Sequence, residues 1–241
     1  MNKKNNDDFK SLGTALREAD RLVNEDMDEE ACKLLEPYLD EFPDNPVLLD
    51  MLAHCYSYIA EYDKAIHLER SLLEIRMSLE ARYETLSFMC RLFKLSDKYD
   101  EALKIANIMI IQYPNNPHSH LEALNCYFTL RDAENAQLHV LVIEKIMGNN
   151  RKYTEDIKLL TGLAMFYNDQ GEYERSIIIL KKALEIYPTD ENLLGYIADA
   201  YFYTDNFIEA RKYYQLIIDN HPEHWQLGYV FEQIKKCDGY F

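Results

Sequence analysis

The chain of 241 residues carries 42 acidic side chains against 26 basic ones, a formal net charge of −16, and 48% of its residues are hydrophobic. This is the composition of a folded protein and not of a disordered one. An acidic surface repels the phosphates of nucleic acids and of anionic lipids, so we expect neither a nucleic acid nor a membrane as a partner, although solubility alone also accounts for the acid excess.

Cysteine usage and hydropathy indicate the compartment. The five cysteines are odd in number and widely spaced, which fits neither a disulfide framework nor a zinc site of the CxxC type. No apolar run approaches the roughly 20 residues of a membrane span, and no apolar segment follows Lys3 and Lys4 as it would in a signal peptide. These features predict a protein of the reducing cytoplasm.

A repeat of 34 residues organises the chain. Residues 1–10 are expected to form a flexible leader, and residues 11–241 a single domain. The repeat is plainest where the segments beginning at Ile157 and Glu191 align without gaps. Like residues then coincide: Leu160 and Leu194, Ala164 and Ala198, Tyr167 and Tyr201, Pro188 and Pro222. Continued backwards, the register gives repeats one to six at residues 12–45, 46–82, 83–116, 117–156, 157–190 and 191–224, followed by a capping helix at 225–237.

Each repeat has the pattern of two helices. Positions 4, 7, 8 and 11 are spaced by three and four residues and form one stripe of a first helix. Position 8 is small in most repeats and holds Ala19, Ala53, Cys90, Leu124, Ala164 and Ala198. Position 20 is small throughout and holds Ala31, Ala65, Ala102, Ala136, Ser176 and Ala210. Small residues at both positions let a second helix pack closely on the first, and short polar links make the two antiparallel.

Two repeats are longer than 34 residues. Repeat two has three additional residues, where Met77 replaces the closing proline, and we expect the helix to run on through LLEIRMSLEARY at 72–83. Repeat four has six additional residues, within the segment GNNRKYTED at 148–156. This segment is a hinge, an inserted loop or a part of the binding site, and the sequence leaves the choice open.

These columns resemble the tetratricopeptide repeat family over residues 12–237. The resemblance is strongest in repeats five and six and weakest in repeats one and four, where Glu18 and Leu124 stand at positions that are usually apolar or small. It implies an all-α fold, an α-solenoid of about six helical hairpins with a C-terminal capping helix, wound as a right-handed superhelix. A degenerate first repeat is expected because one face of a terminal repeat meets water.

Motifs for catalysis or cofactor binding do not stand out. The seven glycines are too scattered for a phosphate-binding loop. The pairs His118 with His120 and His221 with His224 could ligate a metal, but they stand at junctions between hairpins, where polar residues are common. We therefore expect no enzyme activity, no cofactor and no metal. An enzyme or metal-binding protein that uses surface histidines is the least favoured alternative.

The family resemblance also implies a binding surface. In such proteins, positions 2, 5, 6, 9, 12 and 13 of the first helices line a concave groove that binds peptides. The predicted groove residues are Met51, His54, Tyr58, Phe88, Arg91, Lys94, Asn125, Phe128, Met165, Asn168, Tyr196, Asp199, Phe202, Tyr203 and Tyr229. The same positions include the polar residues Asp50, Glu122, Lys158, Thr161 and Asn192. The many aromatic and methionine side chains favour a binding surface, unless the rings turn inward between hairpins.

The sequence therefore predicts a non-catalytic scaffold or adaptor, which binds a peptide or helix of a partner protein in its groove. Arg91 and Lys94 form a basic spot that could hold an acidic group of the ligand, or pair with Asp50 or Glu84. The family's carboxylate clamp is disfavoured, because its basic residues are absent from repeats one and two. The alternative is self-assembly, in which Trp225 and the C-terminal helix dock on a neighbouring copy, and the oligomeric state is open.

Overall fold

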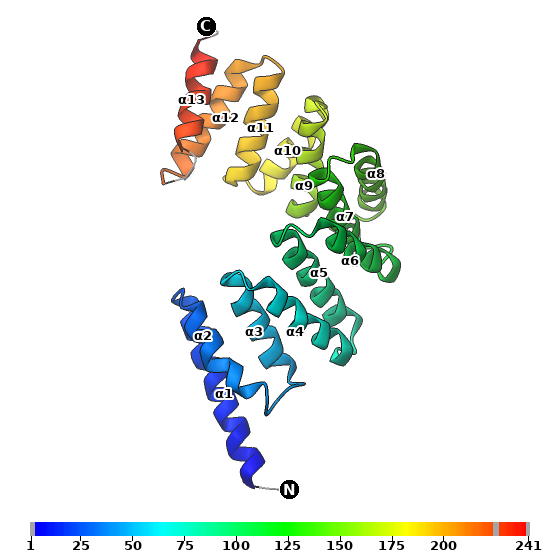
Figure 1. The fold of residues 1–241 in the computed structure, drawn as a ribbon. Helices are drawn as coiled ribbons and strands as arrows, with labels where there is room; N and C mark the ends of the chain where they lie inside the picture. Colours follow the sequence, from blue (N-terminus) through cyan, green and yellow to red (C-terminus); the bar gives the residue numbers. More distant parts are fainter. Residues whose placement is uncertain (1–2, 224–226, 240–241) are drawn as a thin grey trace. The chain divides into compact units, whose positions relative to one another are not determined.

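The computed structural model describes residues 3–223 and 227–239, and their side chains from Ser11 onward. Within these residues the chain is entirely helical outside its turns, with thirteen α-helices and two short 3₁₀-helices (Figure 1). The helices gather into two compact units, Met1–Pro114 and Asn115–Phe241, which we call the N-terminal half and the C-terminal half.

The N-terminal half consists of hairpins of consecutive helices. These are α1 (Lys3–Asn24), α2 (Asp28–Leu35), α3 (Pro46–Tyr58), α4 (Tyr62–Ile75), α5 (Leu79–Leu95) and α6 (Tyr99–Gln112), with the 3₁₀-helix η1 (Glu36–Tyr38) after α2. Helix α1 packs against α2, α3 against α4, and α5 against α6. Contacts of α2 with α3 and of α4 with α5 join one hairpin to the next.

The C-terminal half continues this pattern. Its helices are α7 (Pro117–Thr129), α8 (Ala133–Asn149), α9 (Ile157–Asp169), α10 (Tyr173–Ile186), α11 (Glu191–Tyr203), α12 (Phe207–Asn220) and α13 (Leu227–Asp238), with η2 (Arg151–Tyr153) after α8. The hairpins are α7 with α8, α9 with α10 and α11 with α12, and α13 packs against α12. The first helices α7, α9 and α11 also contact one another in turn.

Polar side chains determine where most first helices begin. The capping residues accept hydrogen bonds from backbone N–H groups of the first helical turn: Asn45, Ser78, Asn116, Asp156 and Asp190. Such bonds satisfy N–H groups that have no partner inside the helix. Pro46 and Pro117 follow their caps at the first helical position, where the missing N–H of proline has no cost.

A left-handed residue ends the first helix of each hairpin. Position 15 of every repeat has a φ between 56° and 73°, at Asp26, Ala60, Asp97, Arg131, Gly171 and Asp205. The N–H of the following residue then reaches a carbonyl five residues earlier, as from Glu61 to Tyr56 and from Glu172 to Tyr167, both at 2.8 Å. This is the Schellman form of helix end. Its recurrence at one position shows that the 34-residue register holds in repeats one and four as well.

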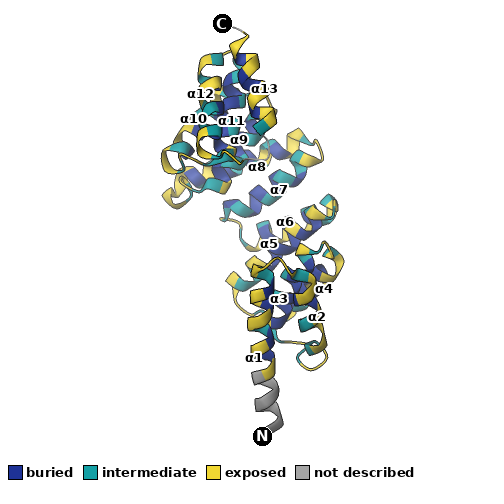
Figure 2. Ribbon diagram, turned by 90° about the vertical axis from the view of Figure 1, so that its left-hand side faces the viewer, coloured by how far each residue is buried: buried dark blue, intermediate teal, exposed yellow. Residues whose placement is uncertain are grey.

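The small residues that were predicted to allow close packing are buried. All residues at positions 8 and 20 of the six repeats are at most 1% exposed, and they lie in the buried stripes between helices (Figure 2). In repeat five the Ser176 hydroxyl at position 20 donates to the Ala164 carbonyl at position 8, at 3.1 Å. The predicted all-α fold of consecutive hairpins is confirmed.

Some boundaries differ from the sequence prediction. Helix α1 already begins at Lys3, so residues 3–10, which were predicted as a flexible leader, have a helical backbone. Once a helix has been nucleated, each further residue adds one hydrogen bond, which explains the extension. The expectation that a helix runs on through residues 72–83 was wrong: α4 ends at Ile75, and α5, of 17 residues, begins at Leu79 because the Ser78 side chain caps a new helix start. Trp225 of the predicted capping helix lies outside the described residues. The single domain stays a prediction, and so do the alternatives for residues 148–156, a hinge, an inserted loop or a part of the binding site.

Candidate functional site

A depression of about 350 Å³ lies on the first-helix face of the C-terminal half. It is lined by Leu121, Glu122 and Asn125 of α7, by Ile157, Lys158, Thr161, Gly162 and Met165 of α9, and by Asp190 and Asn192 at the start of α11. We call it the C-terminal depression. Most of these residues stand at positions 2, 5, 6 and 9 of repeats four to six, the positions that the sequence analysis assigned to the groove. Two predicted groove residues, Asn125 and Met165, lie in it together.

Gly162 is a residue of the depression that the sequence analysis missed. It stands at position 6 of repeat five, where a side chain would project from α9 toward α7. A Cβ atom there would collide with Cδ1 of Leu121, so any larger residue would require the Leu121 side chain to move. The sequence did contain a signal for Gly162, because a glycine inside a helix lowers stability and is therefore expected only where packing requires it.

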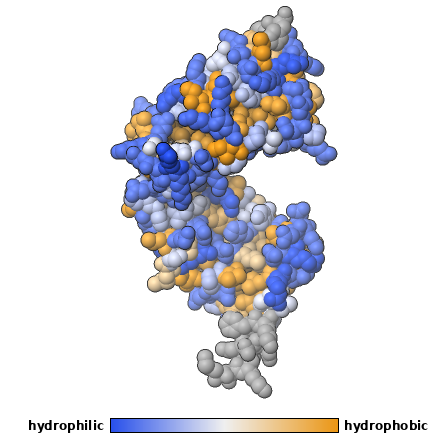
Figure 3. Space-filling model, turned by 180° about the vertical axis from the view of Figure 1, so that it is seen from behind, coloured by the Kyte–Doolittle hydropathy of each residue, from blue (hydrophilic) through white to orange (hydrophobic). Residues whose placement is uncertain are grey.

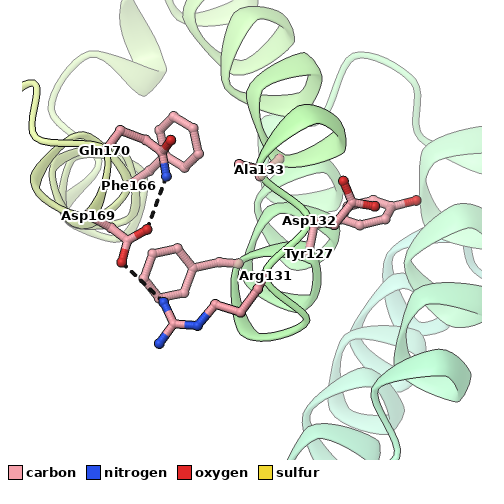
Figure 4. A pocket seen from close by; sticks show the side chains of 9 residues that line it. Tyr127, Arg131, Asp132, Ala133, Phe166, Asp169 and Gln170 are labelled. Carbon is pink, nitrogen blue, oxygen red and sulfur yellow. Dashed lines mark hydrogen bonds and ion pairs between the residues drawn. The ribbon is translucent and has the colours of Figure 1, made fainter.

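A smaller pocket of about 60 Å³ lies where the α7–α8 turn meets the end of α9. Its apolar lining includes Phe128, which was predicted, and Phe166, which is 1% exposed and was not. Arg131 and Asp169 face each other across it and form an ion pair of 3.3 Å (Figure 4). Because the Arg131 side chain is 77% exposed, water screens this pair and it contributes little stability.

Asp199, a predicted groove residue, holds the last helices together. Its Oδ1 accepts hydrogen bonds from the hydroxyls of Tyr214 at 2.5 Å and Tyr229 at 3.2 Å, which lie on α12 and α13. Burial raises the pKa of Asp199, and the two hydrogen bonds lower it. Burial together with the Asp199 carboxylate raises the pKa of Tyr214 and raises that of Tyr229 to about 12. Both hydroxyls therefore keep their protons near neutral pH and continue to donate.

The predicted rings divide into inward and outward groups. Phe202 packs on Phe207, with ring centroids 5.4 Å apart, and joins the core. Tyr203, one residue later, is 64% exposed and stacks on Tyr173 at 5.3 Å. Tyr196 is half-buried against the core, and its carbonyl accepts from Nδ2 of Asn168. In the view of Figure 3, patches of hydrophobic surface lie among hydrophilic surface in both halves.

The N-terminal half brings three predicted residues into one cluster. The His54 ring of α3 stacks on Phe88 of α5, with centroids 4.3 Å apart, and the Arg91 guanidinium lies 4.6 Å from the same ring. Phe88 itself is 8% exposed, so it forms the base of the cluster while Arg91 is exposed. Among the other predicted residues of this half, Met51 and Lys94 are half-buried and Tyr58 is 62% exposed.

The histidine pairs take separate partners. Nε2 of His118 lies 3.0 Å from a carboxylate oxygen of Asp156, whereas Nδ1 of His120 lies 3.1 Å from Nδ1 of His139. Nε2 of His221 meets the Thr189 carbonyl, and His224 lies outside the described residues. In the part of the chain that the structure describes, no three histidine, cysteine, aspartate or glutamate side chains form a group that could hold a metal ion. No described helix is long and apolar enough to cross a membrane.

Comparison with protein families decides how these hairpins are classified. Models of the tetratricopeptide repeat match residues 157–190 and 196–224, which are repeat five and most of repeat six. The chain contains tetratricopeptide repeats. The family predicted from the sequence is thereby confirmed. A comparison with curated protein sequences found no match.

Solved structures share the fold of this chain at low sequence identity. A tetratricopeptide repeat protein from Parabacteroides merdae is 18% identical, with a TM-score of 0.70 over 95% of this chain and 87% of that one. One chain of the Cut9–Hcn1 hetero-tetramer of the APC/C is 15% identical, with a TM-score of 0.68 over 93% of this chain, which spans 42% of that chain. YrrB, described as a TPR protein with an unusual peptide-binding site, is 15% identical, with a TM-score of 0.54 over 84% of this chain and 97% of that one.

Proposed function

We propose that this tetratricopeptide repeat protein is a non-catalytic scaffold that binds an extended segment of a partner protein in the C-terminal depression. The observation that carries the proposal is the depression itself, which three successive first helices line. Tetratricopeptide repeat proteins are interaction scaffolds in general, and YrrB is described as a TPR protein with an unusual peptide-binding site. The depression is too small for a whole helix and suits a few residues of extended chain.

The lining of the depression suits a peptide. Asn125, Thr161 and Asn192 offer amide and hydroxyl groups, which can donate to peptide carbonyls and accept from peptide N–H groups. Met165 offers a flexible apolar contact for one side chain of the ligand. Lys158 is exposed at the edge and can hold a carbonyl or carboxylate oxygen. Polar groups that converge beside apolar contacts are typical of binding sites.

The charge of the chain favours a basic partner. With a net charge of −16, the protein attracts a positively charged partner over distances of about 10 Å at moderate salt. Long-range attraction of this kind raises the association rate, whereas contacts inside the depression determine the dissociation rate. We therefore expect a segment that carries an apolar anchor and belongs to a basic protein.

A pair of matched variants tests the depression. Lys158→Glu reverses the charge at its edge, and Lys145→Glu makes the same change on α8, outside the depression, so both variants acquire the same net charge. Partners are captured from the native cell with the wild-type chain, identified by mass spectrometry and then measured singly with each variant. We expect Lys158→Glu to weaken binding at least tenfold and Lys145→Glu to leave it unchanged. Equal binding by both variants would contradict the proposal.

The exposed guanidinium of Arg91 on α5 supports a second contact in the N-terminal half. It lies over Phe88, beside Lys94 one turn further along the helix, so that a cation and an apolar base are presented together. Arg91→Glu tests this contact in the same binding measurement.

We also infer the cytoplasm as the compartment, because all five cysteines, each in the described part of the chain, are buried thiols outside any disulfide.

Self-assembly through the C-terminal helix is the second candidate. It is supported by Phe231 and Tyr229 on α13, which are 49% and 47% exposed. Apolar side chains that are exposed on a terminal helix favour association with another surface. Light scattering over a hundredfold range of concentration separates the two candidates. A protein that stays monomeric throughout this range would contradict self-assembly and would remain compatible with the scaffold function.

A further inference from the structure

Glu69 on α4 occupies a position in the core that is otherwise not charged. It stands at position 24 of repeat two, and the other repeats hold Leu35, Ala106, Val140, Leu180 and Tyr214 there. Every residue of this column is at most 1% exposed, and Glu69 is 0% exposed. A carboxyl group has thus replaced an apolar contact in the centre of the N-terminal half.

The surroundings of Glu69 do not satisfy a carboxylate. Neither of its oxygens has a hydrogen-bond partner among the described residues. The charged groups that face it are Asp50 on α3, Arg76 in the α4–α5 link and Arg91 on α5. The hydroxyl of Thr85 on α5 is also close enough to lower the pKa of Glu69, although no hydrogen bond of ordinary geometry joins the two.

The guanidinium of Arg76 is already engaged by other acceptors. Its Nη2 donates to Oδ1 of Asp50 at 2.7 Å, and its Nη1 donates to Oγ1 of Thr85 at 2.7 Å and to the Ala81 carbonyl at 3.3 Å. Asp50 stands at position 5 of α3, one of the groove positions, and its side chain is 42% exposed against 16% for Arg76. Asp50 can therefore return to water if Arg76 leaves it.

The two ionisation states of Glu69 require different arrangements of Arg76. Burial, with a smaller effect of the Asp50 carboxylate, raises the pKa of Glu69 to about 8 against the opposing effect of Arg76. While it keeps its proton, the side chain is neutral and remains in the core at moderate cost. Once ionised, it must gain a cation or a donor, since an unpaired buried charge is far more costly than an unpaired neutral group.

We propose that Glu69 is a proton-operated switch that determines whether Arg76 binds Asp50 or Glu69. With the proton on Glu69, Arg76 remains on Asp50 and neutralises it. Without the proton, Arg76 turns inward to Glu69, and Asp50 becomes an uncompensated negative charge on the first-helix face of α3 and α5. Arg91 stays over Phe88, because it is exposed and would lose more hydration on moving inward. The switch concerns this chain alone and does not depend on the proposed partner site.

Carboxyl and guanidinium signals of the full chain test the switch. Carbon-13 NMR follows the glutamate and aspartate carboxyls and nitrogen-15 NMR the arginine Nε atoms, from pH 5 to 9.5. We expect one glutamate carboxyl to titrate near pH 8, with the Asp50 carboxyl and the Arg76 Nε shifting at the same midpoint. Glu69→Gln should remove all three transitions. Glu74→Gln, an exposed glutamate of the same helix, should leave them in place.

Two results would overturn the proposal. If the Glu69 carboxyl titrates below pH 6, Glu69 is already ionised at neutral pH and cannot act as the proposed switch. A Glu69 carboxyl that titrates near pH 8 while the Asp50 and Arg76 signals stay constant through that midpoint shows burial without switching. If Glu69→Gln does not fold, Glu69→Leu matches the apolar column and replaces it in the same titration, with the same expected loss of all three transitions.

Discussion

Glu69 and His120 stand at positions 24 and 4 of their repeats, where the other repeats hold aliphatic residues or, once, tyrosine. Glu69 is 0% exposed and His120 is 8% exposed, so burial removes both from water. It raises the pKa of the carboxyl group and lowers that of the imidazole. Both side chains are thus kept neutral in the folded state near neutral pH, and their contributions to stability change in opposite directions as the pH rises.

The pKa of Glu69 determines how stability changes toward alkaline pH. Since the folded value of about 8 lies above the ordinary value of 4.5, the folded state holds the proton more tightly. The stability that the protonated Glu69 side chain contributes to the folded state is fully present below pH 4.5 and is lost as the pH rises through 8. Glu69→Leu should therefore gain stability relative to the wild type between pH 5 and 8.5, by about 1–4 kcal/mol. Urea unfolding at the two pH values measures the gain, and an equal difference at both would contradict this account.

The pair His120 and His139 should make the fold sensitive to acid. Their Nδ1 atoms lie 3.1 Å apart, so one ring donates and the other accepts while both are neutral. Burial, with a smaller effect of His120, lowers the pKa of His139 to about 4 from 6.5. Stability from the neutral pair is present above pH 6.5 and is lost as the pH falls toward 4.

Replacing both rings by apolar residues tests this acid sensitivity. Leucine stands at position 4 in repeats two, three, five and six, and a phenylalanine at 139 can keep the stacking on Tyr127, whose ring lies 5.5 Å from that of His139. In His120→Leu with His139→Phe, the unfolding midpoint should rise relative to the wild type as the pH falls from 6.5 to 4. His118→Gln, beside the pair, is the matched control. A parallel decline of the double variant and the wild type would rule out the histidine pair as the cause.

At the scale of the hairpin, the left-handed residue at position 15 predicts opposite changes in stability for two substitutions. Ala60 has a φ of 60°, in a conformation that costs an L-residue about 1–2 kcal/mol, whereas Gly171 has 73° at the same position of repeat five without that cost. Ala60→Gly should stabilise the chain by about 1 kcal/mol, and Gly171→Ala should destabilise it by a similar amount. Thermal unfolding of both variants measures the two effects. Shifts of the same sign would show that the turns do not determine them.

The repeat register explains why the hairpins could be predicted. Small residues at positions 8 and 20 fill the space between two helices only when these helices pack closely. The positions that recur in the sequence are therefore the positions that are buried in the structure. The start of α1 at Lys3 could not be predicted in this way, because helix extension follows from backbone hydrogen bonding and not from an apolar stripe. The charge in the position-24 column was visible in the register, but its lack of partners was not.

The candidate site was predictable in its positions and not in its side-chain directions. Positions 2, 5, 6 and 9 did locate the C-terminal depression, because helical geometry fixes which positions share a face. The direction of a ring depends on its neighbours: Phe202 turns inward to Phe207, whereas Tyr203 remains exposed. Gly162 was missed because a search for binding side chains passes over a residue without one. Whether the predicted groove residues bind a partner stays a prediction.

For the whole molecule, the pattern of contacts implies that a perturbation stays local. The helix pairs with most contacts are neighbours along the chain, as in other repeat proteins, where stability is a sum of repeat and interface contributions. Asp199 lies at one such interface, since its carboxylate joins α11 to Tyr214 of α12 and Tyr229 of α13. Asp199→Ala leaves two tyrosine hydroxyls without their acceptor, at a cost of about 1–3 kcal/mol.

This loss should appear in the last helices and fade along the chain. In Asp199→Ala, amide hydrogen exchange should accelerate by about tenfold or more in α12 and α13, because about 1.4 kcal/mol of local opening free energy corresponds to a factor of ten. Exchange in α3 to α6 should not change. Asp219→Ala, an exposed carboxylate on α12, is the matched control and should leave α13 protected. Acceleration throughout both halves would show instead that the repeats unfold as one cooperative unit, because a cost at one interface would then lower the stability of every helix equally.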